Sequence, residues 1–182
     1  MRRLIAVLFA ILSLSAVLAQ DAKKPKEPEY ANSFFFLDKD GDLKALERQA
    51  AKVATKMKFG GADSTYVIPN DRSAVRFAAN ANLQFVVLPE PNNADPVTIF
   101  QLYLLKVTKD HREVQVAKVR TFSGAKNTLG STAVAFDVAK YGEKSVVLKP
   151  QGPLAPGEYM WAANSSLMVP QGYCFGIDKA NP

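Results

Sequence analysis

The stretch VTIFQLYLLKV at residues 97–107 decides the fold class. It is a long run of β-branched, aromatic and other apolar residues, a composition that is typical of a buried strand. The polar residues 109–111 then predict a turn, and the valines that recur across 114–119 predict a returning strand. The sequence therefore predicts a long β-hairpin over 97–119.

Further short strands are expected on both sides of this hairpin, separated by turns rich in Gly, Pro and Asn. They are predicted at 34–37, 65–68, 74–77, 85–88, 134–136, 145–148, 158–163 and 173–177. Short strands at fairly regular spacing, divided by such turns, favour a β-sandwich. We therefore expect an all-β protein with one domain.

The segment from Leu43 to Met57 allows two interpretations. Its apolar residues recur at helical spacing, and Asp42 is suited to cap a helix. The Gly60-Gly61 pair that follows leads instead into strand-like sequence, which favours a strand.

Residues 154–159, LAPGEY, indicate the subclass of sandwich. A Pro156-Gly157 turn followed by Tyr159 at the opening of a strand is typical of the corner in immunoglobulin-like sandwiches, where the tyrosine hydroxyl bonds to nearby backbone. We therefore expect an immunoglobulin-like β-sandwich in which Pro156, Gly157 and Tyr159 have structural roles.

The N-terminus predicts export. Arg2 and Arg3 precede an apolar run from Leu4 to Leu18, and Ala19 is a suitable residue before a cleavage site. The run is shorter than the ~20 residues that a membrane-spanning helix needs. We expect residues 1–19 to be a signal peptide that is removed, leaving a periplasmic or extracellular protein.

The sequence is expected to divide into three segments: the signal peptide at 1–19, a flexible linker at 20–33 and a single β-sandwich domain at 34–180. The linker is expected because Lys, Pro and Glu dominate it. Removing the leader takes away two arginines and no acids, so the net charge falls from +6 to +4. The lysines are scattered along the chain, which argues against a nucleic-acid partner.

Single residues limit the possible chemistry. Cys174 is the only cysteine and His111 the only histidine, so a disulfide framework within the chain and multi-cysteine or multi-histidine metal sites are excluded. Cys174 lies in an apolar run, and we expect it to be a small buried structural residue. His111 is expected in an exposed turn.

One acidic turn resembles part of a calcium-binding loop. Asp38, Asp40 and Asp42 match the first three ligand positions of a calcium loop, but Leu43 stands where that loop needs glycine and Gln49 where it needs glutamate. An acidic turn between two strands explains the same residues. Calcium or glycan binding, through this turn and exposed aromatic residues, is kept as an alternative function.

A serine hydrolase is the second alternative. Ser123 and Lys126 satisfy the S-x-x-K spacing at which a lysine can activate a serine nucleophile. The sequence lacks the partner motifs K-T-G and S-D-N, and the pair falls in a polar loop rather than at a helix start.

Several stretches resemble a set of uncharacterised secreted bacterial proteins. They are 36–38 with 46–49, 72–77, 111–114, 140–142, 154–159 and 174–178, in that order along the chain. The resemblance implies a β-rich exported domain and favours strand for part of Leu43 to Met57. It implies no catalytic residue and no cofactor.

We therefore expect a non-enzymatic binding or structural module of the cell envelope or the secreted fraction. Its partner would be a protein or a glycan, without a nucleic acid, a resident cofactor or a membrane span after leader cleavage.

Overall fold

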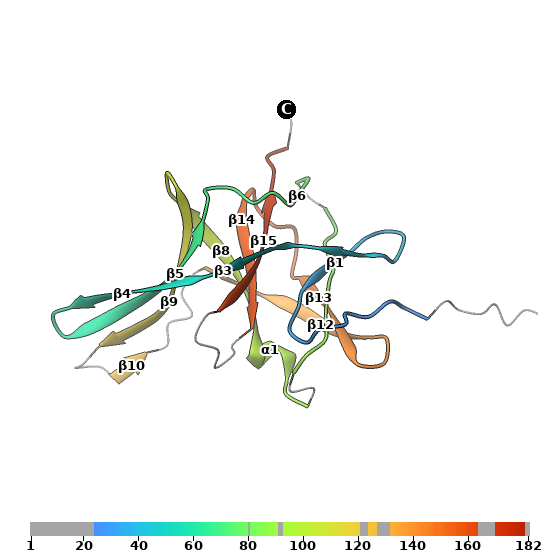
Figure 1. Ribbon diagram of the computed structural model, residues 1–182, viewed down its shortest axis with the longest axis horizontal. Coiled ribbons are helices and arrows are strands. Elements are labelled where there is room, and N and C mark those ends of the chain that lie inside the picture. Colours follow the sequence, from blue (N-terminus) through green and yellow to red (C-terminus); the bar gives the residue numbers. More distant parts are fainter. Residues whose placement is uncertain are drawn as a thin grey trace, which may run out of the picture.

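Two β-sheets packed together form the described part of the chain, as Figure 1 shows for this computed structural model. The structure describes residues 24–79, 81–90, 93–120, 124–126, 132–163 and 170–180. The expectation of an all-β sandwich is confirmed. The predicted signal peptide and Ser123 lie outside the described residues. Within those ranges, no helix has the length and apolar character that crossing a bilayer would require.

The smaller sheet has five antiparallel strands. Their order across the sheet is β12 (Phe136–Tyr141), β13 (Ser145–Pro150), β7 (Phe85–Val87), β1 (Phe35–Leu37) and β2 (Leu43–Ala45).

The larger sheet curls back on itself. Its main order is β3 (Glu47–Ala50), β15 (Gln171–Ile177), β14 (Gly157–Ala163), β8 (Phe100–Val107), β9 (His111–Arg120), β5 (Gly61–Pro69) and β4 (Lys52–Lys58). Only Ala51 separates β3 from β4, so the first and last strands of this order are one continuous stretch of chain. We call this element the curled sheet.

Three short strands lie off the main path of the curled sheet. β6 (Arg76–Phe77) runs parallel to β15, β10 (Gly124–Lys126) pairs with β9, and β11 (Ala133–Val134) pairs with β8.

The curled sheet is buried on both faces of its central strands because side chains alternate along a strand. On β14, Tyr159 and Trp161 face the smaller sheet. Trp161 packs with Phe85 of β7, and Tyr159 stacks on Phe175 of the neighbouring strand β15. Met160 lies between these two residues in the sequence and faces the inside of the curl. The core inside the curl comprises Ala51, Ile68, Tyr103, Leu105, Val114, Met160, Ala162 and Cys174. The molecule therefore has two apolar cores that share β8, β14 and β15.

A tyrosine corner connects β14 to the turn before it. The Tyr159 hydroxyl donates to the Ala155 carbonyl at 2.8 Å, which is the hydrogen bond expected from the sequence. Pro156 and Gly157 lie between the two residues.

The structure decides between the two interpretations of one segment and corrects one local prediction. The helical interpretation of 43–57 fails because this segment forms β2, β3 and β4, and the pairing of β3 with β15 and of β4 with β5 supplies its backbone hydrogen bonds. Residues 97–99, expected as strand, belong instead to the short helix α1 (Pro96–Ile99). Asp95 caps this helix by accepting from the Val97 N–H at 3.0 Å.

The segment 24–33 is bound to the domain, in contrast to the flexible linker expected for 20–33. The Glu27 carboxylate accepts hydrogen bonds from the backbone N–H groups of Glu143, Lys144 and Ser145 and from the Ser145 hydroxyl. Burial alone would raise the pKa of Glu27, but these four hydrogen bonds outweigh it and lower the pKa to about 2.

Replacing Glu27 tests this anchor. A carboxylate whose pKa is lowered on folding stabilises the folded state above its unfolded pKa, and the contribution is lost as the pH falls towards the folded value. We expect Glu27→Gln to lower the free energy of unfolding at pH 7 by about 1–2 kcal/mol. The difference from wild type should shrink between about pH 5 and pH 2.

Urea unfolding across that pH range measures the effect. Glu29→Gln, on the same segment and exposed, is the matched control and should change stability little. A loss equal in both variants, or one that does not depend on pH, would contradict the anchor.

Candidate functional site

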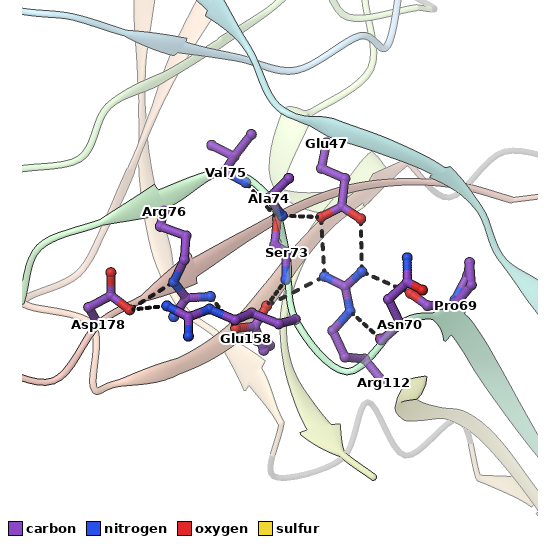
Figure 2. A network of polar contacts seen from close by, with 11 residues as sticks. Glu47, Pro69, Asn70, Ser73, Ala74, Val75, Arg76, Arg112, Glu158 and Asp178 are labelled. Atoms are coloured by element: carbon purple, nitrogen blue, oxygen red, sulfur yellow. Dashed lines mark hydrogen bonds and ion pairs between the residues drawn. The ribbon is translucent and has the colours of Figure 1, made fainter. Parts of the chain in front are cut away.

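A fully buried arginine lies at one end of the curled sheet. Arg112, on β9, is 0% exposed, and its guanidinium meets the carboxylate of Glu47 on β3 in two contacts, of 2.9 and 3.4 Å. A third contact, of 3.4 Å, reaches Glu158 on β14. The other two N–H groups donate to the carbonyls of Asn70 and Pro69, each at 3.0 Å. All five guanidinium donors therefore have acceptors, which a buried arginine requires (Figure 2).

The two carboxylates also hold the loop between β5 and β6. The Ser73 N–H donates to Glu158 at 2.8 Å, and the Ala74 N–H donates to Glu47 at 3.1 Å. Three strands and this loop are thus joined through one guanidinium and two carboxylates.

The network continues from the buried end to the surface. Arg76 on β6 donates to Glu158 at 2.5 Å and to Asp178 at 2.8 Å, and the exposed Arg72 donates to Asp178 at 3.0 Å. The Arg76 guanidinium lies against Gly176, where a Cβ atom would overlap it. Glycine at 176 therefore leaves the space that Arg76 occupies.

The charges in this network balance, with three arginines against three carboxylates. Burial raises the pKa of Glu47, but hydrogen bonds from Arg112 and its other partners outweigh it, so the pKa lies below its usual value. Burial likewise lowers the pKa of Arg76, and its bonds to Glu158 and Asp178 reverse that effect. Both groups therefore stay charged at neutral pH.

A groove of about 900 Å³ opens beside the outer part of the network. Arg72, Arg76, Asp178 and Lys179 supply its charged side chains. Its apolar wall consists of Phe77, Ala78, Ala79, Pro156, Ile177 and Ala180. Three cations and one carboxylate line this groove, and Glu158 lies behind Arg76 and fixes the position of its guanidinium. With Glu158 included, the rim keeps a net charge of +1.

The structure does not gather the predicted calcium ligands. Asp38 accepts from the backbone N–H groups of Asp40 and Asp42 at 3.0 and 2.8 Å and lies 3.4 Å from Lys44, while Asp42 pairs with Lys26 at 2.5 Å. Among the described residues, no group of three His, Cys, Asp or Glu side chains could hold a metal ion. Asp38 instead closes the turn, in which Gly41 has a φ of +79°.

Glycan binding needs exposed aromatic side chains, but several of the large aromatic residues of this chain lie in the core. Phe34, Tyr103, Trp161 and Tyr173 are all buried, because they face the smaller sheet or the inside of the curl. They cannot line an exposed surface.

The remaining residues that the sequence singled out do not belong to the ion-pair network of Arg112. His111 begins β9, and its Nδ1 lies 2.7 Å from Asp110. Lys126 falls in β10, and its predicted partner Ser123 is outside the described residues. Cys174 is fully buried inside the curl, where burial raises the pKa of its thiol to about 12. The nearby Arg112 acts to lower this pKa, while Glu47 and Glu158 act to raise it.

Sequence analysis missed the arginine network. The signal available was alternation: Arg112, Val114 and Val116 occupy every second position, so a strand places Arg112 on the same side as the two valines. Glu158 likewise opens a strand that is otherwise apolar. An ionisable residue in such a position implies a buried partner of opposite charge.

No protein-family model matches this chain, and no curated protein is significantly similar to it.

Removing Arg112 should be highly destabilising. Arg112→Met leaves the carboxylates of Glu47 and Glu158 buried without their main cation, so we expect the free energy of unfolding to fall by about 3–5 kcal/mol. Neutralising the two acids in the same chain, as Arg112→Met/Glu47→Gln/Glu158→Gln, should recover part of that loss.

Chemical denaturation at pH 7 measures both effects. Arg48→Met is the matched control, since Arg48 is exposed on β3 next to Glu47 and should change stability by about 0.5 kcal/mol or less. Equal losses for Arg112→Met and Arg48→Met would show that the buried network does not stabilise the fold.

Proposed function

We propose that this protein is an exported, non-enzymatic binding module that holds an acidic ligand in the groove beside Arg72 and Arg76. The observation that carries the proposal is the combination of an electropositive rim and an apolar wall in one groove of about 900 Å³. A guanidinium binds carboxylates through paired hydrogen bonds, and an apolar wall accommodates the rest of an extended ligand.

The rigidity of the rim supports a binding role. Arg76 is fixed by Asp178 through Nε and by Glu158 through Nη1, and within the described chain Nη2 makes no hydrogen bond. Arg72 contacts Asp178 through Nη2. Donors held in place before binding lose little freedom when a carboxylate arrives. The favoured ligand class is an acidic segment of an envelope protein.

The lack of a hydroxyl, thiol or imidazole side chain among the described lining residues of the groove is consistent with the proposed non-enzymatic role. Among the described residues that line it, none is Ser, Thr, Cys or His. The single histidine, His111, lies elsewhere on β9 beside Asp110. The proposal of export rests on the N-terminal sequence, where a basic start precedes a short apolar run.

The immunoglobulin-like character is proposed only for the corner at Tyr159. The hydrogen bond from Tyr159 to Ala155 supports it. The curled sheet differs from the open sheets of that fold, because β3 and β4 join its two ends.

A titration with hexaglutamate followed by NMR tests the groove. At about 0.15 M salt, which screens weak surface attraction, we expect the amide signals of residues 76–79 and 177–180 to shift. Arg72→Gln should weaken the binding about tenfold, since it removes charge-assisted hydrogen bonds without disturbing the buried arginine.

Hexalysine and Arg48→Gln are the controls. Hexalysine should leave the groove signals unchanged, and Arg48→Gln should bind hexaglutamate like the wild type. Shifts scattered over the surface, or an affinity that Arg72→Gln does not alter, would refute a groove that binds acidic ligands.

A further inference from the structure

The hairpin of β4 and β5 carries exposed apolar side chains at its end. Phe59 is 102% exposed and Met57 77%, and Val53 on the same strand is 45% exposed. Three of the six large hydrophobic side chains that are exposed in the described chain therefore fall within residues 53–59. Exposed hydrophobic residues are normally scattered singly over a protein surface, whereas a cluster of them marks a contact surface.

The geometry places Phe59 at the extreme end of the hairpin. Lys58 pairs with Gly61, so Phe59 and Gly60 form a two-residue turn in which Gly60 has a φ of +75°. Figure 1 shows β4, β5 and β9 extending away from the smaller sheet, with this turn at the far end. The aromatic ring is therefore fully exposed at the end of this hairpin.

Lysines surround this apolar end. Lys52, Lys56 and Lys58 are exposed on β4, and Asp63 on β5 pairs with Lys58 at 2.5 Å. Three lysines against one aspartate give the hairpin a net charge of +2. Lysines alone are an ordinary protection of an edge strand, but they do not explain the exposed Met57 and Phe59.

We propose that the end of this hairpin docks on the surface of an anionic lipid bilayer. Phe59 and Met57 would enter the boundary between headgroups and acyl chains, where an aromatic ring is favoured. Lys56 and Lys58 would remain among the anionic headgroups, since a lysine buries its alkyl stem and keeps its ammonium group in water.

The charge and the small apolar area favour a bilayer over a second copy of this chain. Two copies meeting at this surface would bring two hairpins of charge +2 together, and three side chains fall short of the ~1,000 Å² that a stable protein interface buries. The surface lies apart from the groove at Arg72, so this proposal is independent of the proposed ligand.

A tryptophan at the end of the hairpin provides a local test. Phe59→Trp reports its own surroundings, whereas the sole native tryptophan, Trp161, is buried and gives a constant background. We expect a blue shift of its emission, and quenching by brominated lipids, with vesicles of phosphatidylglycerol and phosphatidylcholine. Pure phosphatidylcholine should have little effect. Because the probe sits at the hairpin, binding through the N-terminal segment would not reproduce this signal.

Lysine variants and a matched probe complete the test. Adding Lys56→Gln and Lys58→Gln should weaken the vesicle affinity about 25-fold, since each lysine near an anionic surface contributes about fivefold. Val107→Trp, at another exposed apolar position, is the control and should not shift. The proposal is overturned by unchanged Phe59→Trp emission, by an equal shift at both positions or by a shift that does not depend on the lysines. A concentration-dependent shift without vesicles would instead identify a second copy as the occupant.

Discussion

The buried ion pairs of Arg112 with Glu47 and Glu158 are the constraint on which the rest of the structure depends. They join β9, β3 and β14, which are far apart in the chain, and they hold the loop that leads to β6. Transfer of these charges from water is costly, so the arrangement is stable only because every guanidinium donor has an acceptor. Glu47 on β3 and Arg112 on β9 are four strands apart in the order of the sheet, so they meet only when the sheet curls. The ion pairs therefore select the closed form of the sheet over an open one.

This constraint shapes both surfaces that we interpret functionally. At one end, Glu158 holds Arg76 and thereby fixes the rim of the groove, while Gly176 leaves the space in which the guanidinium lies. In the other direction, β4 continues from β3 past Ala51, so the hairpin that carries Phe59 extends from a strand that the network anchors. A rigid centre with a groove at one place and a projecting hairpin at another is the organisation expected of a binding module.

The fold was largely predictable from sequence because alternation and turn residues are local signals. The turn between β8 and β9, the later strands and the contact of Tyr159 with its own turn all follow from neighbouring residues. The predicted hairpin is shorter than expected, because β8 and β9 pair only at Lys106–Glu113 and Val107–Arg112. Closure of the sheet was not predictable, since it depends on pairing between distant segments such as β3 and β15. The ion-pair network was missed for the same reason: Arg112 and Glu47 are 65 residues apart.

The accessibility of the Cys174 thiol tests most directly whether the Arg112 network keeps the sheet closed. Cys174 lies inside the curl, paired with Glu47 of β3 and Met160 of β14, so a thiol reagent can reach it only when the curl opens. We compare Arg112→Met with Leu148→Ala, a core variant of the smaller sheet. Our account predicts that, in Arg112→Met, the reagent labels Cys174 through an opening that costs less free energy than global unfolding. In Leu148→Ala, it should label Cys174 only through global unfolding. Labelling through global unfolding alone in both variants would contradict it.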